Sequence, residues 1–568
     1  MSASKIKILP DAIINKIAAG EVVERPASVV KELVENAIDA GSSQITIEIK
    51  KAGKKLIRVS DNGEGIVKSD LLLALSRHAT SKISNENDLY AVRTLGFRGE
   101  ALASVAAVSQ LEMFSFCQGE KSGAKIVLEG GRQVGLEDFG CPQGTTVEVK
   151  DLFFNTPARQ KFLKADATEQ FHIVDLVGNI ILSHPEISFK LVDDGKTSLA
   201  STGSGSLKEA LVYVFGSEIA GQFIPVEGVG VHGFISRPSV SRLDRKYQSF
   251  FVNGRCVKNF PLSRALDDAL QNVIPRGRYP MAVIFIDIDP REIDVNVHPA
   301  KREIKFANQG EVMARLRAAV AQAVGNKSEE EGKGRQFLPC QRFGGNEWQA
   351  DAAAVWQKEI AEPTFDFKLG EGELEVTPVP LYQIDNTYII AVGPKSMILI
   401  DQHAAHERVL FDKLSQASVR GQAHSQKLLI PENVALTPAE SKLLGNSLGY
   451  LHSLGFEIEV FGKDTFAVRA VPAILVKVAA AELIKDVVAE YADSGRAQSN
   501  KEKEDKILKM LACKGAVKAG QKLLAEEMKT LIKDLFATTQ PHTCPHGRPT
   551  YIQYTTADLE KMFKRRGF

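Results

Sequence analysis

The chain is poor in the features that mark secreted and membrane proteins. It has six cysteines in 568 residues, scattered without the density of a disulfide framework, so we expect a reducing, cytoplasmic compartment. We see no signal peptide and no apolar run near ~20 residues, and we therefore expect no membrane span. Lys+Arg (71) and Asp+Glu (70) nearly cancel. Any surface for DNA must then be a local basic patch, for which 237–246 and 561–566 are candidates, although such clusters are usually just solvated surface.

A chain of this length, with 44% hydrophobic residues, is expected to form three or four domains. Residues 1–215 and 216–330 show α/β patterns, and the second range contains the turn signal Asn253-Gly254. Residues 331–375 lose apolar periodicity and are predicted to be a flexible linker. Order returns at 376–568, where 381–391 is predicted to be extended and 397–400 a strand. The predicted fold class is α/β (α+β).

The segment from Lys31 to Gly41 is the most informative. Val30, Leu33, Val34, Ala37 and Ile38 recur at helical spacing and should face a core. The opposite face gathers the polar residues Glu32, Glu35, Asn36 and Asp39. Taken alone, such a face is usually just solvated. Two strand patterns follow, however, and the second runs into Asp61-Asn-Gly-Glu-Gly65, so the combination favours a site for a nucleotide and its metal.

A glycine-bearing segment, 95–102, completes this pattern. Gly96 and Gly99 allow backbone N–H groups to approach an anion closely. The helix that should begin here adds a partial positive charge at its N-terminus. A lone Gly-x-x-Gly is more often a plain turn, but here it follows the other two motifs in order.

These motifs resemble those of the GHKL ATPases. Longer runs resemble the MutL mismatch-repair family over about the first 330 residues and again from about 376 to the end. These runs are 17–28, 78–82, 96–102, 151–159 and 296–301. The resemblance implies a GHKL ATPase α/β sandwich at 1–215, a transducer domain at 216–330, and a C-terminal dimerisation and endonuclease domain at 376–568. An inserted helical subdomain with a regulatory role is expected at about 432–505.

The resemblance also implies the roles of the nucleotide residues. Glu32 is expected to polarise water for attack on the γ-phosphate of ATP, and Asn36 to ligate Mg²⁺. Asp61 is expected to accept a hydrogen bond from the adenine amino group. Lys301 is expected to reach the γ-phosphate from the transducer domain. The remaining predicted ATP contacts are Asp39, Gly63, Gly65, Thr80, Ser81, Lys82, Gly96, Phe97, Arg98, Gly99, Glu100, Ala101, Leu102 and Thr145, with 78–96 as a lid over ATP.

A second site is predicted near the carboxyl end. His403 and Glu407 are four residues apart on a helix expected after the 397–400 strand, so they share one face. Distant segments offer Cys513, Cys544 and His546. Each residue alone is weak evidence, but together thiolate, imidazole and carboxylate favour Zn²⁺, with Mn²⁺ possible at an oxygen-rich neighbouring position.

Asp401-Gln-His-Ala-x-x-Glu407 resembles the motif of the endonuclease branch of the family. The implied reaction is nicking of one DNA strand by metal-assisted hydrolysis, with Asp401, His403 and Glu407 holding or tuning the metal. The sequence departs from the motif at its last position, where Asp412 stands in place of Glu. An alternative therefore stays open: an ATP-gated DNA clamp and matchmaker that does not nick, whose Cys/His cluster is a structural zinc site.

The segment Gln426-Lys-Leu-Leu-Ile-Pro431 resembles a short peptide that docks on the replication sliding clamp. The predicted contacts are Gln426, Leu428, Leu429, Ile430 and Pro431. An ordinary strand is the alternative interpretation. The resemblance further implies a homodimer that works on DNA with a MutS-like mismatch-recognition protein.

Overall fold

The computed structural model describes residues 20, 22–82, 94–96, 99–271, 273–275, 277–294, 304–325, 377–420, 423–493, 500–518, 520–563 and 565. These residues fall into two compact units. One contains those within 1–326 and 424–507, and the other those within 327–423 and 508–568. The predicted linker at 331–375 and the residues Phe97, Arg98 and Lys301 lie outside the described part of the chain. No helix among the described residues combines the length and the apolar character needed to cross a bilayer.

An eight-stranded sheet forms the first domain of the larger unit, in the order β5-β4-β3-β6-β2-β1-β7-β8. Its strands are antiparallel except for the parallel β1–β7 pair. The strands are β1 (Gln44–Lys50), β2 (Leu56–Asp61), β3 (Gln110–Phe116), β4 (Gly123–Glu129), β5 (Arg132–Phe139), β6 (Gly144–Lys150), β7 (Ser188–Asp193) and β8 (Lys196–Ala200). The helical segments are α2 (Pro26–Asp39), η1 (Lys68–Asp70), α3 (Leu71–Ala74), α5 (Ala101–Ala107), α6 (Pro157–Lys161), α7 (Asp166–Ser183), α8 (Leu207–Phe215) and α9 (Ser217–Ala220).

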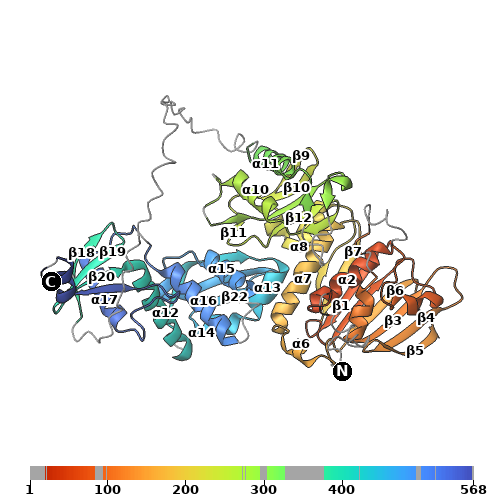
Figure 1. The fold of residues 1–568 in the computed structure, drawn as a ribbon, viewed down its shortest axis with the longest axis horizontal. Helices are drawn as coiled ribbons and strands as arrows, with labels where there is room; N and C mark the ends of the chain where they lie inside the picture. Colours follow the sequence, from red (N-terminus) through yellow and green to blue (C-terminus); the bar gives the residue numbers. More distant parts are fainter. Residues whose placement is uncertain are drawn as a thin grey trace, which may run out of the picture. The chain divides into compact units, whose positions relative to one another are not determined.

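The helix α2 forms where the sequence predicts it. Pro26 occupies its first turn, where a missing N–H costs nothing. Its apolar face, which includes Val30, Leu33 and Val34, is buried. Helices α2 and α7 pack side by side and contact the sheet through β2 and β7 (Figure 1). This packing leaves the polar face of α2 beside the end of β2 and the loop that follows it.

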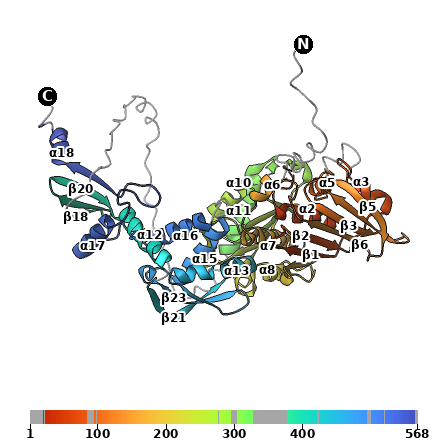
Figure 2. The same cartoon turned by 90° about the horizontal axis from the view of Figure 1, so that it is seen from below.

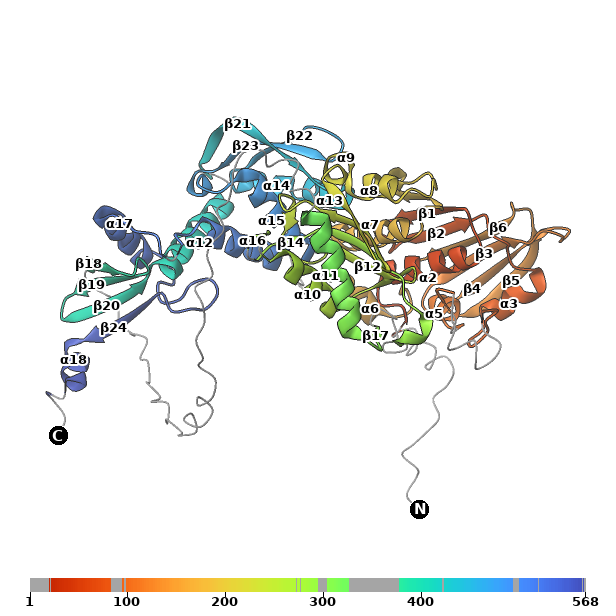
Figure 3. The same cartoon turned by 90° about the horizontal axis from the view of Figure 1, so that it is seen from above.

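A five-stranded sheet forms the next domain, in the order β13-β12-β15-β10-β9. Its strands are β9 (Phe223–Gly228), β10 (Val231–Ser236), β12 (Gln248–Val252), β13 (Arg255–Val257) and β15 (Ala282–Ile286). Helices α10 (Phe260–Leu270) and α11 (Gln309–Gly325) pack beside each other and share its core (Figure 3). Short pieces are β11 (Ser241–Arg242), β14 (Tyr279–Pro280), η2 (Pro290–Glu292), β16 (Ile293–Asp294) and β17 (Lys305–Phe306).

The predicted turn at Asn253-Gly254 is confirmed. Both residues have positive φ, +48° and +78°, as a tight turn between antiparallel strands requires. The turn joins β12 to β13, which pair in an antiparallel register from Val252–Arg255 to Phe250–Val257. Arg255 is therefore placed at the first position after a rigid turn.

The prediction of an inserted helical subdomain is wrong in that respect: besides its helices, the segment contains a three-stranded sheet, in the order β21-β23-β22. The elements are β21 (Ser425–Ala435), α13 (Pro438–Gly445), α14 (Leu448–Ser453), β22 (Glu457–Val460), β23 (Thr465–Pro472), η3 (Ala473–Leu475) and α15 (Ala480–Asp493). A capping box of Thr437 and Glu440 begins α13.

The second unit is built on an antiparallel sheet in the order β18-β19-β20-β24. The elements are β18 (Val379–Ile384), β19 (Tyr388–Gly393), β20 (Ser396–Asp401), α12 (Gln402–Arg420), α17 (Ala525–Phe536), β24 (Tyr551–Thr555) and α18 (Thr556–Met562), together with the last turns of α16 (Asn500–Gly515). Helices α12 and α17 pack against one face of this sheet (Figure 2).

The range 381–391, which we expected to be one extended segment, is two strands. Asp385 and Asn386 both adopt positive φ, +46° and +50°, and they form the turn of the β18–β19 hairpin. Asp and Asn tolerate this left-handed conformation better than most residues. Asp385, Asn386 and Thr387 interrupt the apolar pattern, so the turn has a local sequence signal that the prediction of one extended segment did not use.

Candidate nucleotide site and metal-ligand cluster

The polar face of α2 carries a compact set of charges. Lys31 Nζ lies 3.2 Å from a Glu32 carboxylate oxygen and 3.0 Å from a Glu35 carboxylate oxygen. Burial opposes the charge of the lysine, but the two carboxylates outweigh it and raise the pKa of Lys31. The Glu32 side chain is 26% exposed, so it lies at a surface that water can reach.

One turn further along α2, Asn36 and Asp39 bind the residues predicted to form the lid. Lys82 Nζ donates to Asn36 Oδ1 at 3.0 Å and to Asp39 Oδ2 at 2.6 Å. The Asp39 carboxylate, only 6% exposed, also accepts from the backbone N–H groups of Leu95 (2.9 Å) and Gly96 (3.1 Å). The predicted Mg²⁺ ligand thus faces an ammonium group in this conformation, and the glycine loop is held against α2.

Asp61 organises the loop after β2. Its Oδ1 accepts from Gly63 N at 2.9 Å, Thr145 N at 3.2 Å and Ser42 Oγ at 3.2 Å. Burial raises the pKa of Asp61 although these three donors oppose the shift. The side chain of Thr145 is within 2.9 Å of Ser115 Oγ. The structure therefore brings together Asp61, Gly63 and Thr145, three predicted nucleotide contacts from distant segments.

The glycines at this site are required by close approach. A Cβ on Gly65, where φ is +77°, would lie 2.2 Å from the Phe116 carbonyl oxygen. A Cβ on Gly99, where φ is +63°, would lie 2.3 Å from the Ala79 carbonyl oxygen. Both positions combine a left-handed backbone with a backbone neighbour that cannot move aside cheaply.

The remaining predicted contacts lie around Gly99. His78 N donates to the Gly99 carbonyl at 3.0 Å, and the His78 ring is 3.3 Å from the Glu100 carboxylate. Thr80 Oγ1 accepts from Lys82 N at 3.2 Å, and Ser81 is exposed. Ala101 and Leu102 form the first turn of α5.

Arg255 is a residue that sequence analysis missed at this site. It belongs to β13 of the second domain, yet its Nη2 donates to the Thr94 carbonyl at 2.9 Å. Burial lowers the pKa of Arg255, and the charges of Glu35 and Asp39 counteract that shift. No motif spacing in the sequence connects Asp39, Thr94 and Arg255. The turn at Asn253-Gly254, directly before Arg255, is the nearest sequence signal to this contact.

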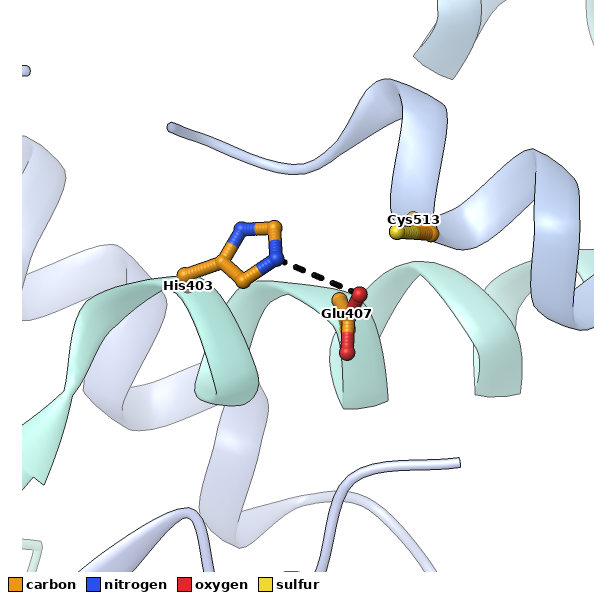
Figure 4. Close-up of side chains that lie close together, drawn as sticks. All are labelled: His403, Glu407 and Cys513. Carbon is orange, nitrogen blue, oxygen red and sulfur yellow. Dashed lines mark ion pairs between the residues drawn. The ribbon is translucent and has the colours of Figure 1, made fainter. Parts of the chain in front are cut away.

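The second site is centred on Glu407 of α12, whose side chain is 5% exposed. Its Oε1 lies 3.3 Å from His403 Nε2, one helical turn earlier (Figure 4). His403 Nδ1 donates to the Val517 carbonyl at 2.8 Å, because a carbonyl can only accept. This bond leaves Nε2 as the ring nitrogen that faces Glu407.

Cysteine and histidine from two further segments complete this cluster. Ligand atoms of His403, Glu407 and Cys513 lie within 4.8 Å of one another, as do those of Glu407, Cys544 and His546. His546 Nδ1 is 3.2 Å from Glu407 Oε2. Burial opposes ionisation of Glu407, but hydrogen bonds with Cys513 and His546 and the nearby His403 lower its pKa. Burial and the adjacent Glu407 raise the pKa of Cys513 to about 12. All five predicted ligands are therefore brought together.

Asp401 lies at the junction of β20 and α12 and caps the helix. Its Oδ1 accepts from the backbone N–H groups of His403 (2.9 Å) and Ala404 (3.0 Å). Among the described residues it belongs to neither ligand group. Gln402 is fully buried and donates to the carbonyl of Asn386 at 2.6 Å. These two residues fix the start of the helix that carries His403 and Glu407.

Asp412 connects α12 to the loop that carries Cys544. It accepts from Thr539 N at 2.9 Å and Thr539 Oγ1 at 3.1 Å, and it lies 3.5 Å from Arg408 Nη1. Arg408 Nε in turn donates to the Thr543 carbonyl at 2.6 Å. The shorter carboxylate at this position thus has defined partners. Thr539 belongs to the 539–546 loop, and Arg408 is bonded to the same loop at Thr543.

The segment predicted to dock on a sliding clamp interrupts its strand. Residues 425–427 and 432–435 of β21 pair with β23, and the register shifts between Lys427 and Glu432. The side chains within this irregularity are accessible: Leu429 is 99% and Ile430 76% exposed. Gln426 and Pro431 are also exposed, and Leu428 is half-buried.

A helix face bearing Glu32 and Asn36, a half-buried aspartate at the end of β2 and a glycine loop held against that helix define an ATPase of the GHKL type. The family described as "Histidine kinase-, DNA gyrase B-, and HSP90-like ATPase" matches residues 24–135. Two further families match: "DNA mismatch repair protein, C-terminal domain" at 211–325 and "MutL C terminal dimerisation domain" at 381–523.

Curated relatives extend the match to the whole chain. A MutL DNA mismatch repair protein from Symbiobacterium thermophilum is 39% identical over 99% of this chain and 100% of its own length. One from Caldanaerobacter subterraneus is 40% identical with the same coverage. Among solved structures, the ADP-bound MutL ATPase domain of Aquifex aeolicus is 32% identical, covers 47% of this chain and 94% of its own, and has a TM-score of 0.36. The chain belongs to the MutL family of DNA mismatch repair proteins.

Proposed function

We propose that this chain is a homodimeric, ATP-hydrolysing mismatch-repair protein whose C-terminal unit nicks DNA by metal-assisted hydrolysis. The observation that supports nicking is the convergence of four potential ligand groups, from three segments, on one buried carboxylate, Glu407. Buried acidic and thiol groups are costly unless they are paired or bind metal. The mixture of thiol, imidazole and carboxylate is the donor set that zinc prefers.

For the ATPase reaction, the chain supplies positioning and a base. Asp61, held by three donors, presents its second carboxylate oxygen toward an adenine amino group. Gly96, with its N–H held by Asp39, lies in the loop that approaches phosphate. Glu32 accepts a proton from the attacking water. Asn36, whose amide oxygen now accepts from Lys82, is the residue that would hold Mg²⁺, and the ion would supply positive charge at the phosphates.

For nicking, His403, Glu407 and Cys513 would hold one ion, and Glu407, Cys544 and His546 a neighbouring one. When bound, a divalent metal lowers the pKa of a coordinated water and stabilises negative charge on the phosphate. Water adds to the phosphorus, one P–O ester bond breaks, and the departing oxygen takes a proton. Asp401 contributes by holding the first turn of α12, so that His403 and Glu407 keep their direction.

Dimerisation and partners are part of the same proposal. The strands β18 and β19 expose a set of large apolar side chains, Val379, Leu381, Tyr382, Ile384, Tyr388 and Val392, and an apolar surface of this kind fits a second copy of the chain. The exposed 426–431 segment fits a replication sliding clamp. DNA and a MutS-like mismatch-recognition protein are the remaining proposed partners.

The experiment is nicking of supercoiled plasmid in the presence of Mn²⁺. We compare wild type with Glu407→Gln, which removes the carboxylate shared by both ligand groups, and with Asp401→Asn, which should keep α12 folded because asparagine caps helices about as well as aspartate. Asp534→Asn, which changes a carboxylate paired with Lys413 at 2.7 Å, is the control. Nicking by Glu407→Gln and wild type at equal rates would reject the nuclease, whereas Asp401→Asn, which keeps the cap, should nick as wild type does.

A second function is favoured by the contacts of two acidic residues. Asp401 caps α12, and Asp412 holds the loop at Thr539. In this alternative the cluster is a structural zinc site, and the protein acts as an ATP-gated clamp on DNA. Bound zinc without nicking, together with unfolding of the C-terminal unit on chelation, would support it. Nicking that depends on Glu407 would exclude it.

A further inference from the structure

Arg255 makes a contact that joins two domains at the nucleotide loop. Its guanidinium extends from the first residue of β13 to the Thr94 carbonyl, 2.9 Å away. The same loop is held from the other side by α2, because Asp39 accepts from Leu95 N and Gly96 N. Thr94 Oγ1 closes the loop on itself by donating to the Gly96 carbonyl at 2.7 Å.

The base of this contact is rigid. Arg255 follows the Asn253-Gly254 turn, and Asn253 is fixed by two hydrogen bonds with the backbone of Ile288 (2.8 and 3.0 Å). Val252 pairs with Arg255 across the turn. Beyond it, Val257 is buried in the core shared with α10. If the guanidinium moves, the sheet and its helices should therefore move with it, because Arg255 is itself a residue of β13.

We propose that Arg255 is a positioning residue that couples the phosphate-contacting loop at 94–96 to the second domain. This inference rests on the proposed ATPase function. Binding of a triphosphate at Gly96 shifts the loop, and the Thr94 carbonyl moves with it. Arg255 either follows, displacing β13, or releases Thr94 and turns toward Glu35 and Asp39. In both cases the second domain responds to the nucleotide through this side chain.

The proposal predicts a specific division of effects. Arg255→Gln loses the charge and the reach of the guanidinium but leaves Asp39, Asn36 and Asp61 in place. We expect its ATP affinity to stay within about threefold of wild type and its kcat to fall about tenfold, since a lost positioning contact misaligns the loop. Arg255→Lys keeps the charge without the planar fork and should recover part of kcat. The control is Arg315→Gln, because within the described part of the chain the ion pair of Arg315 is with Glu311 on its own helix.

The decisive measurement is hydrogen exchange in 255–270 of the full-length chain, with and without a non-hydrolysable ATP analogue. The analogue should change exchange in wild type and in Arg315→Gln, and leave it unchanged in Arg255→Gln, although all three bind it. A purely structural role for Arg255 would lower protection equally with and without the analogue, which would overturn the proposal. A wild-type chain that does not hydrolyse ATP would instead refute the ATPase function, whatever Arg255 does.

Discussion

Asp412 is the residue that departs from the family motif. Replacing it tests whether it stabilises the candidate metal cluster without being a ligand. Its carboxylate, 7% exposed, accepts two hydrogen bonds from Thr539 and pairs with Arg408. Through Thr539, and through the bond from Arg408 to Thr543, it fixes the approach to Cys544 and His546. We therefore expect Asp412→Ala to weaken zinc binding without removing a ligand.

The magnitude follows from burial. Arg408 is 6% exposed, so removing its partner leaves a buried charge unpaired and should cost about 3 kcal/mol of local stability. Partners that orient metal ligands typically contribute about 10- to 100-fold in metal affinity, equivalent to roughly 1.4–2.7 kcal/mol. Asp412→Asn should fall between wild type and alanine, since asparagine still accepts from Thr539 but offers no charge to Arg408.

The assay is competition for zinc against a chromophoric chelator, combined with hydrogen exchange over 539–546. Asp534→Asn removes a comparable carboxylate from α17 and should bind zinc as wild type does. If Asp412→Ala binds zinc with unchanged affinity while its 539–546 loop exchanges faster, the loop is not what holds Cys544 and His546. The support inferred from these contacts would then be wrong.

Three further outcomes are expected. Glu32→Gln should bind ATP normally but hydrolyse it about 10²- to 10⁴-fold more slowly, measured by phosphate release; an unchanged rate would contradict its role as base. Cys544→Ser should lower the zinc content measured by plasma emission, and retention of all zinc would show that Cys544 is not a ligand. Burial and nearby cations lower the pKa of His172 to about 3, below its unfolded value of about 6.5, so the unfolded chain binds more protons between these pH values. The stability of the N-terminal unit should therefore be full above pH ~6.5 and decline as pH falls. Linkage puts the loss by pH 5 near 2 kcal/mol, which we halve to about 1 kcal/mol for partial exposure. His172→Gln should flatten this decline in thermal unfolding, and an identical decline in both proteins would refute the assignment.

Much of the nucleotide site was predictable because its residues act through local patterns. The apolar spacing of α2 placed Glu32 and Asn36 on one face, and the strand ending at Asp61 placed the carboxylate at a loop. The convergence of His403, Cys513, Cys544 and His546 on Glu407 was predictable for a different reason. Cysteine, histidine and glutamate are donors with few alternative uses in combination, so their chemistry indicated a common site although their spacing did not.

What the sequence does not reveal is which side chains hold these groups in place. The resemblance placed Asp401 in the nuclease motif, but in the structure its carboxylate accepts from the first backbone N–H groups of α12. Arg255 has no motif and reaches Thr94 only because two domains pack together. Contacts of this kind depend on tertiary geometry, and neither periodicity nor residue type encodes that geometry locally.

The charges around α2 suggest how nucleotide binding is linked to loop movement. Three carboxylates, Glu32, Glu35 and Asp39, are matched by Lys31, Lys82 and the Arg255 guanidinium. In the proposed mechanism, Mg²⁺-bound ATP would add a net charge of about −2 and would need the Asn36 oxygen that Lys82 now occupies. Lys82 then has to leave Asn36, and the closest new source of negative charge is the triphosphate itself. In that mechanism the Lys82 ammonium, which holds this residue to Asn36 and Asp39 before binding, would hold it to the nucleotide afterwards.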